Sequence, residues 1–368
     1  MSCFNSGMIP RSSRLSLRRR TAALLLAVVA VAGPGLTGCA NHDETSGAAD
    51  GPLPVDVPPG TELVVADQQE RVQTWLRASG ELDKLPFTIK FANFVGGPAI
   101  LEAFRAGAAD VAQVGDVPPI HALAAGQDVP IVAAYQSNPL ALKLAVAPGR
   151  SITRLADLKG RKIAYAEGTA QQAGVLRALA KAGLAPSDVT LVRLQLNDFL
   201  DAVRTGQVDV APLIEPNVTR LLRTPGASVI PDSELAGLYG GLGYLYARRE
   251  AVRDPAKAAA TRALVAAFIR AQQWSNLHQD EWARTYYVGS QKVGADDAKR
   301  IVDSYGVYTF PHLDQRLVNR QQATIDAIDA AGELPKKIRA ADGFDLRFDA
   351  VVTQTVTEIG ASFGTEPK

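Results

Sequence analysis

The sequence predicts an α/β protein of two units with a helical C-terminal region. Short segments typical of strands, such as Glu62–Asp67 and 162–168, alternate with segments of helical period. A second series of the same kind begins after residue 150, and from Ala251 the pattern is helical throughout. Such alternation is typical of a mostly parallel sheet covered by helices on both faces, so we expect two sheets of this kind with flanking helices.

The first unit is expected to start with the β-rich run Glu62–Asp67, followed by a helical segment that Gly80 ends. Period-2 alternation and short apolar runs predict the next strands, and glycine or proline marks the helix starts. The further strands are expected at 86–94, 110–115, 129–136 and 141–148, and the helices at 100–109 and 118–125.

The second unit follows the segment 149–160 and repeats the same kinds of signal. Its apolar runs are short, and its helical segments carry apolar residues three and four positions apart. The strands are expected at 162–168, 189–195 and 208–215, and the helices at 169–184, 198–207 and 217–223.

Residues 1–38 have the three parts of an export signal. Five arginines precede the uncharged apolar run 21–33, which is too short to cross a hydrocarbon core of about 30 Å, because spanning takes about 20 residues. Residues 36–39, Leu-Thr-Gly-Cys, resemble the bacterial lipobox, in which the cysteine is lipidated and becomes the first residue of the mature chain. We expect lipidation of Cys39 and an extracytoplasmic, membrane-anchored protein. The alternative is an ordinary signal peptide with a chance cysteine.

Removal of this signal would leave a body without thiols, because Cys3 would be lost and Cys39 acylated. Disulfides, cysteine-based metal sites and cysteine nucleophiles are then excluded. The five lost arginines would change the net charge from +1 to −4, which offers no basic field for nucleic acid. Residues 39–60 are rich in Gly, Pro, Ala and acidic residues, as in a flexible tether.

The sequence shows no clear catalytic constellation. The Walker loop, H-E-x-x-H and C-x-x-C do not occur, no strand-turn-helix elbow surrounds a G-x-S-x-G motif, and the histidines are scattered over different segments. The glycines at 240–243 lead into a strand-like run and do not open a helix, which argues against a dinucleotide site. We therefore expect no catalytic residue, no metal and no cofactor.

Three junctions between a strand and a helix are rich in small residues, at 94–103, 114–123 and 166–174. Glycine or threonine allows a ligand to approach the backbone at each junction, and the helix that follows presents unpaired N–H groups and a partial positive charge. Open α/β sheets bind ligands at the carboxyl ends of their strands. We expect an anion site there that needs no Lys or Arg; the alternative is that these are ordinary helix caps.

Three long stretches together carry a family resemblance. They are 96–135, 152–170 and 179–216, and they include Asp-Leu-Lys-Gly at 157–160, Gly-Thr-Ala at 168–170 and Gly-Gln-Val-Asp-Val at 206–210. In this order the stretches resemble the substrate-binding proteins of ABC importers, in the branch that serves nitrate, sulfonates and taurine. They are most similar to the aliphatic sulfonate binders, and the likeness runs from about Glu62 to about Ile338.

This resemblance implies a two-lobed periplasmic-binding-protein fold of type II, in which each lobe is a mixed sheet flanked by helices. Lobe one would combine 61–149 with 242–368, and lobe two would be 150–241. The crossovers would fall near Pro148–Ser151 and Leu238–Gly243. The implied partners are a small anionic solute and an ABC-transporter permease, and the protein would act as a monomer.

Matching the family motifs position by position implies a pocket. Glu215, in Glu-Pro, occupies a position that is acidic in many relatives, where it would hold an amino group, cap a helix or latch the lobes. Its flanking residues Ile214 and Asn217 depart from the common aromatic version of that motif. Tyr239 and Tyr244 are further candidates for the wall of the pocket. The implied ligand-binding residues are Gln68, Gln69, Gly97, Pro98, Gly115, Asp116, Tyr135, Gly168, Thr169, Ala170 and Glu215.

The function expected from the sequence is capture of a small anion, an aliphatic sulfonate or taurine, for an ABC importer. One alternative is an exported enzyme on the same scaffold, such as a desulfinase-like protein. Another is a binding protein for nitrate, bicarbonate or a pyrimidine-type solute. A purely sensory receptor would differ from the importer protein only in its partner.

Overall fold

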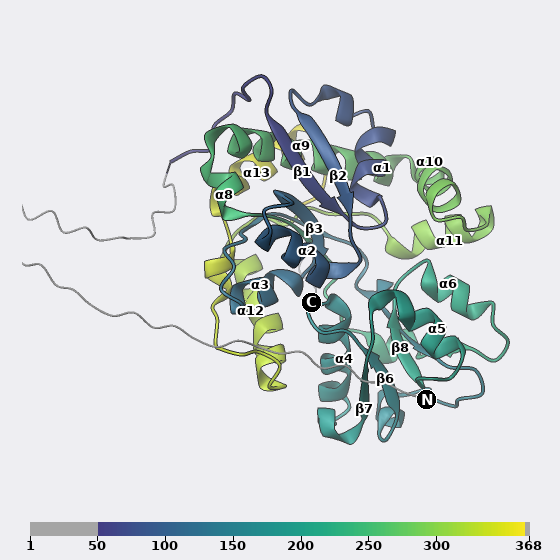
Figure 1. The fold of residues 1–368 in the computed structure, drawn as a ribbon. Coiled ribbons are helices and arrows are strands. Elements are labelled where there is room, and N and C mark those ends of the chain that lie inside the picture. Colours follow the sequence, from purple (N-terminus) through teal and green to yellow (C-terminus); the bar gives the residue numbers. More distant parts are fainter. Residues whose placement is uncertain (1–50, 365–368) are drawn as a thin grey trace, which may run out of the picture. The chain divides into compact units, whose positions relative to one another are not determined.

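Two mixed five-stranded sheets organise residues 51–364, the part of the chain that this computed structural model describes (Figure 1). The expected signal peptide, the lipidation site Cys39 and residues 39–50 of the expected tether lie outside the described residues. Both sheets combine parallel and antiparallel pairs. The mixed sheets that the resemblance implies and the helical C-terminal region are therefore confirmed. The mostly parallel sheets expected from the alternation are not, because half of the strand pairs are antiparallel.

Sheet A has the strand order β2-β1-β3-β10-β4. β1 runs parallel to β2 and β3, whereas β10 is antiparallel to both of its neighbours, β3 and β4. The last strand of the sheet in sequence therefore lies inside it and not at an edge. The strands are β1 Glu62–Asp67, β2 Thr88–Asn93, β3 Val111–Gly115, β4 Ile131–Gln136 and β10 Leu242–Ala247.

Sheet B has the order β7-β6-β8-β5-β9. β6 is parallel to β7 and β8, and β5 is antiparallel to β8 and β9. Sequence analysis identified each of these strands except β9, whose two residues are too few to show a period. The strands are β5 Lys143–Val146, β6 Lys162–Tyr165, β7 Thr190–Arg193, β8 Val210–Leu213 and β9 Ser228–Val229.

Most helices between the strands begin close to the predicted positions, but α2 begins four residues before the expected 100, and α7 was not predicted from the sequence. Pro118 and Pro119 open α3, where a missing backbone N–H has no cost, and Thr169 caps α4 with its side chain. These helices are α1 Arg71–Ala78, α2 Gly96–Arg105, α3 Pro118–Ala124, α4 Ala170–Lys181, α5 Phe199–Arg204, α6 Asn217–Leu222 and α7 Asp232–Leu235.

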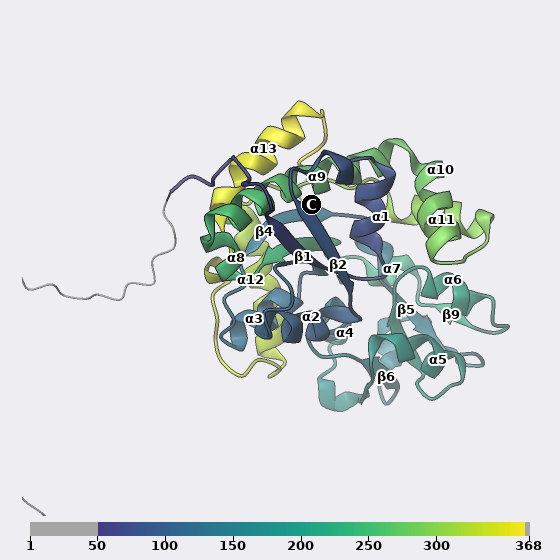
Figure 2. The same ribbon diagram turned by 45° about the horizontal axis from the view of Figure 1, so that its top comes forward.

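The helical C-terminal region packs mainly against sheet A. The longest helix, α9, starts at Pro255 and is capped by the Asp254 side chain, which accepts a hydrogen bond from the Lys257 N–H at 2.8 Å. Figure 2 shows α9 behind β1 and β2, with α13 beside it. The elements are α8 Arg249–Arg253, α9 Pro255–Leu277, α10 Gln279–Trp282, a π-helix Ala283–Ser290, α11 Ala295–Tyr305, α12 Gln315–Ala330 and α13 Asp349–Glu358.

The chain passes between the sheets twice. It leaves sheet A after β4 and joins sheet B at β5, within residues 137–142, and it returns to β10 within residues 236–241. We call sheet A with the helices packed on it lobe A, and sheet B with its helices lobe B. The first passage precedes the expected Pro148–Ser151, because β5 pairs with β8 and β9. An apolar run such as 143–146 predicts a strand but does not indicate which sheet the strand joins.

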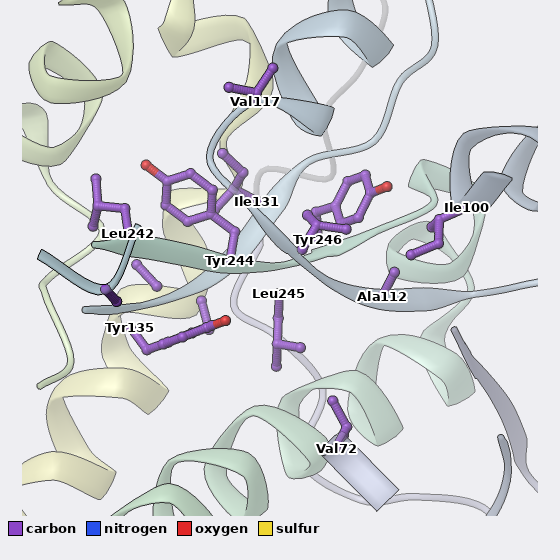
Figure 3. Packing of buried hydrophobic residues seen from close by; sticks show 14 of the residues in the cluster. Val72, Ile100, Ala112, Val117, Ile131, Tyr135, Leu242, Tyr244, Leu245 and Tyr246 are labelled. Atoms are coloured by element: carbon purple, nitrogen blue, oxygen red, sulfur yellow. The ribbon is translucent and has the colours of Figure 1, made fainter. Parts of the chain in front are cut away.

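Strand β10 forms the centre of the lobe A core. All six of its residues are buried, so its sequence is apolar or aromatic at consecutive positions. Figure 3 shows the Tyr244 and Tyr246 side chains on one face of β10 and Leu245 on the other, packed near Tyr135. Each buried Tyr removes roughly 150–250 Å² from water, so this strand anchors the sheet on both faces. No helix within residues 51–364 is long and apolar enough to cross a membrane.

Candidate ligand-binding cleft

A cavity of about 180 Å³ lies where the strand ends of the two sheets meet. It is lined from lobe A, lobe B and both crossing segments, for example by Gln69, Ser137, Asn197 and Gly241. One water needs about 10–15 Å³ of such space, so the cavity has room for a small organic solute. Of the residues implied by the family motifs, those that line it are Gln68, Gln69, Gly97, Gly115, Tyr135, Thr169 and Ala170.

Arg71 supplies positive charge to the cavity. It stands in the first turn of α1, and its guanidinium carbon lies 5.6 Å from the ring centre of Tyr286 and 5.7 Å from that of Tyr305. Among the described residues no carboxylate forms an ion pair with Arg71, and no Asp, Glu, Lys or His lines the cavity. A guanidinium stays charged in proteins, so Arg71 is a fixed cation held by aromatic faces and available to an anion.

Arg71 was missed by the sequence analysis, which expected an anion site without Lys or Arg. The available signal was its position: an arginine in the first helical turn after β1 lies at the carboxyl end of a strand, where α/β sheets bind ligands. What the sequence does not show is that no carboxylate within residues 51–364 pairs with the guanidinium, because this depends on residues from distant segments.

The Asp67 carboxylate fixes the loop that presents Arg71. It accepts hydrogen bonds from the backbone N–H groups of Gln68 at 2.7 Å, Val72 at 3.0 Å and Gln73 at 2.9 Å. Burial raises the pKa of Asp67 above its usual value, while these N–H donors and the charge of Arg71 oppose the rise. The carboxylate is therefore used within lobe A and caps α1.

The amides of lobe A form a chain along the cavity wall. Gln68 Nε2 donates to the Gln113 carbonyl at 3.0 Å, and Gln113 Nε2 donates to the Tyr135 hydroxyl. Burial raises the pKa of Tyr135 to about 12, so its hydroxyl stays protonated. One of the two side-chain N–H groups of Gln68, an implied ligand-binding residue, is thus engaged within the protein.

Helix α4 contributes its first turn from lobe B. Thr169 Oγ1 accepts from the Gln172 N–H at 3.3 Å and donates to the Ala166 carbonyl at 2.6 Å, which fixes the start of the helix. Ala170 and Gln171 line the cavity, and first-turn N–H groups have no partner within their helix. They form a neutral seat for an anion, reinforced by the helix dipole.

The two walls come into close contact at two glycines. A Cβ atom on Gly115 would lie 2.9 Å from Ala170 Cβ of lobe B. A Cβ atom on Gly97 would lie 2.3 Å from Pro118 Cγ and 3.1 Å from the Gly168 carbonyl oxygen. These glycines therefore permit contact between the walls, because any side chain at either position would collide.

The other implied residues lie outside the cavity lining. Pro98 packs near Gly168, whose N–H donates to Gln172 Oε1 at 2.9 Å and is not offered to a ligand. Asp116 is buried, and its backbone carbonyl accepts from Gln321 Nε2 at 2.7 Å. Burial raises the pKa of the Asp116 carboxyl.

Glu215 lies behind the cavity wall, where its carboxylate caps α6 and faces Arg300 of lobe A. Of the two further tyrosine candidates, Tyr239 lines the cavity, whereas Tyr244 is buried in the core of lobe A. Within the described residues no group of His, Cys, Asp and Glu could hold a metal ion.

Comparison with known proteins places the chain in a family. The family model described as NMT1/THI5 like matches residues 95–228. A protein of Escherichia coli (strain K12) named as an aliphatic sulfonates-binding protein is 30% identical over 250 residues, which are 68% of this chain and 77% of that protein. The chain belongs to the NMT1/THI5-like family of binding proteins. The resemblance found in the sequence is thereby confirmed.

Solved structures agree with this membership. The alkanesulfonate-binding protein SsuA from Xanthomonas axonopodis pv. citri, bound to MOPS, has a TM-score of 0.71 at 24% identity and covers 78% of this chain and 99% of its own. The periplasmic aliphatic sulphonate binding protein SsuA from Escherichia coli has a TM-score of 0.67 at 26% identity and covers 79% and 100%. This NMT1/THI5-like protein therefore has the expected two-lobed periplasmic-binding-protein fold. Its relatives support an extracytoplasmic solute-binding role.

Proposed function

We propose that this protein captures an aliphatic sulfonate or taurine and delivers it to an ABC importer. The observation that carries the proposal is Arg71, a fixed cation that has no carboxylate partner among the described residues and lines the same cavity as the first turn of α4. A guanidinium and backbone N–H groups together suit the oxygens of a sulfonate, which hold one negative charge. The names of the Escherichia coli and Xanthomonas relatives support the same ligand class.

Capture would occur by closure of the lobes over the solute. Each wall supplies part of the anion site, so the full set of donors exists only when the lobes come together. Closing around a ligand needs no nucleophile, in keeping with a cleft whose described lining has no carboxylate, histidine or lysine. We further propose a lipid on Cys39 as the membrane anchor, an ABC-transporter permease as partner, and a monomeric receptor.

The test is ligand-dependent stability of the purified protein. Ethanesulfonate and taurine are compared with nitrate, bicarbonate and an aminopyrimidine in thermal unfolding and calorimetric titration. A bound ligand raises the unfolding free energy by RT ln(1 + [L]/Kd), about 2.7 kcal/mol at 100 times Kd. We expect sulfonates to raise the melting temperature. Absence of any sulfonate effect at millimolar concentration would overturn the proposed ligand class.

The same samples test the enzyme alternative. After incubation with a bound sulfonate, the solute is recovered and examined by mass spectrometry. We expect the sulfonate unchanged and in stoichiometric amount. Release of sulfite or a desulfonated product at a rate proportional to protein concentration would assign the protein to the enzyme class instead.

A further inference from the structure

The carboxylate of Glu215 lies directly behind the cavity wall without lining it. Its neighbours Ile214 and Asn217 both line the cavity, whereas the Glu215 side chain is only 7% exposed. Its backbone carbonyl accepts a hydrogen bond from the Tyr305 hydroxyl at 3.3 Å, and Tyr305 also lines the cavity. The Glu215 carboxylate is therefore separated from the cavity by residues adjacent to it in the chain.

Arg300 and Thr219 hold this carboxylate in place. Glu215 Oε2 accepts from the Thr219 N–H at 2.9 Å and from Thr219 Oγ1 at 2.7 Å. Its other oxygen, Oε1, faces Arg300 Nη1 at 3.5 Å, while Arg300 Nη2 donates to Thr219 Oγ1 at 2.7 Å. Both carboxylate oxygens are therefore engaged, and the negative charge of Glu215 is paired.

This cluster joins the two lobes. Glu215 follows β8, and Thr219 lies on α6 of lobe B, whereas Arg300 projects from α11, which packs on the π-helix of lobe A. Arg300 is also tethered within its own helix by Asp297 at 3.0 Å. The Arg300 guanidinium therefore reaches Glu215 only when the lobes are as close as they are here.

The pairing of Glu215 with Arg300 affects which solutes can bind in the cleft. An aminosulfonate such as taurine carries an ammonium group as well as the sulfonate, and a buried ammonium without a partner is strongly unfavourable. The described cavity lining offers no carboxylate. Of the carboxyl groups behind it, Asp67 and Glu215 are occupied by helix N–H groups and by Arg300, and Asp116 is buried within lobe A. A sulfonate with an uncharged tail has no ammonium group to bury, so it does not incur this cost.

We propose that Arg300 determines the specificity of the cleft by occupying Glu215. With Arg300 in place, the closed cleft selects sulfonates with uncharged tails over zwitterionic aminosulfonates. Without it, Glu215 Oε1 would be free to repel an anion and to attract an ammonium group. This inference rests on the proposed function and narrows its ligand class.

The test compares ethanesulfonate with taurine, which differ only by the ammonium group. Dissociation constants are measured by calorimetry at fixed pH and ionic strength for the wild type and for Arg300→Gln. We expect the wild type to prefer ethanesulfonate by about tenfold or more, and Arg300→Gln to reduce that preference by about tenfold. The Arg300 side chain is 51% exposed, so the variant should fold, and thermal unfolding checks this.

Arg223→Gln is the matched control. Arg223 lies on the same seam between the lobes, is 61% exposed and pairs with Asp297 of α11 without touching Glu215. The substitution Arg223→Gln therefore removes the same charge as Arg300→Gln, and it also removes one ion pair between the lobes. We expect it to weaken both ligands equally. If Arg300→Gln does no more than that, Arg300 is a latch only and the proposal fails.

A double variant separates charge from contact. Glu215→Gln combined with Arg300→Gln has no free carboxylate, so the preference for ethanesulfonate should return, and its persistent loss would contradict the proposal. A wild type that binds both ligands equally would also overturn it while leaving the proposed function intact. A wild type that binds no sulfonate would overturn the proposed function itself.

Discussion

The two walls of the cleft offer an anion different kinds of attraction. Lobe A contributes a formal charge, Arg71, surrounded by the rings of Tyr286 and Tyr305. Lobe B contributes no formal charge to the described lining and offers instead the first turn of α4 beside apolar residues such as Phe199 and Leu213. A charged wall attracts an anion from solvent, whereas neutral N–H donors act only at contact distance. Lobe A is therefore suited to bind first and lobe B to complete the site.

Removing the charge of lobe A should have the largest effect. We expect Arg71→Met to raise the Kd for an aliphatic sulfonate by at least about 100-fold, as for other buried charged contacts. The ligand-free protein should melt at the same or a higher temperature, because Arg71 has no described carboxylate partner and its partial burial is unfavourable. Calorimetry and thermal unfolding give both values.

Arg77→Met is the control for this change. Arg77 lies on the same helix, is exposed and does not line the cavity. Its replacement should leave the Kd unchanged. An equal loss in both variants would mean that the anion responds to the general field of lobe A and not to Arg71.

Separating the walls should have a smaller effect. A Cβ atom on Gly115 would lie 2.9 Å from Ala170 Cβ, so Gly115→Ala should hinder closure and raise the sulfonate Kd by about tenfold. The melting temperature without ligand should change little, because open lobes avoid the collision. Adding Ala170→Gly removes the opposing methyl group and should restore binding. Failure of this rescue would show that the substitution disturbs lobe A itself.

A neutral contact between the lobes should give the smallest effect. His121 Nε2 of α3 lies 2.9 Å from Gln172 Oε1 of α4. The negative charges of Glu167 and Glu333 favour the charged form of His121. Burial outweighs them and lowers the pKa of His121 below its usual value of about 6.5. As pH falls from 6.5 toward the folded pKa, the unfolded chain takes up a proton that the folded chain does not, so stability decreases.

The change His121→Asn isolates this contribution. Between pH 7 and pH 5 the melting temperature should fall further for the wild type than for the variant. The difference between the two decreases should be less than about 2 °C. Differential scanning calorimetry at several pH values measures the difference. Equal slopes in the two proteins would show that His121 does not titrate in this window.

Much of the fold could be predicted from the sequence because its signals are local. Glu62–Asp67 and Leu242–Ala247 appear as β-rich runs, and Pro118 and Thr169 mark the starts of their helices. The sheet joined by Lys143–Val146 could not be predicted, because an apolar strand carries no record of its neighbours.

The candidate site divides in the same way. Small residues at strand-to-helix junctions form a local pattern that indicated the three junctions, and the family motifs implied Gly97, Gly115 and Thr169 within them. The availability of Arg71 and the pairing of Glu215 with Arg300 were not found, because each depends on side chains far apart in sequence. Long-range charge pairing leaves no period in the sequence.

The position of β10 sets an order of assembly. Sheet A has β10 between β3 and β4, so a chain made or exported from its N-terminus cannot join those two strands before residue 247 has emerged. Every strand of sheet B lies within 143–229 and is complete earlier. Until then β3 and β4 each present an unpaired edge, the kind of surface on which other chains add strands. A chain cut short before β10 would therefore be prone to aggregate although all of lobe B had been made.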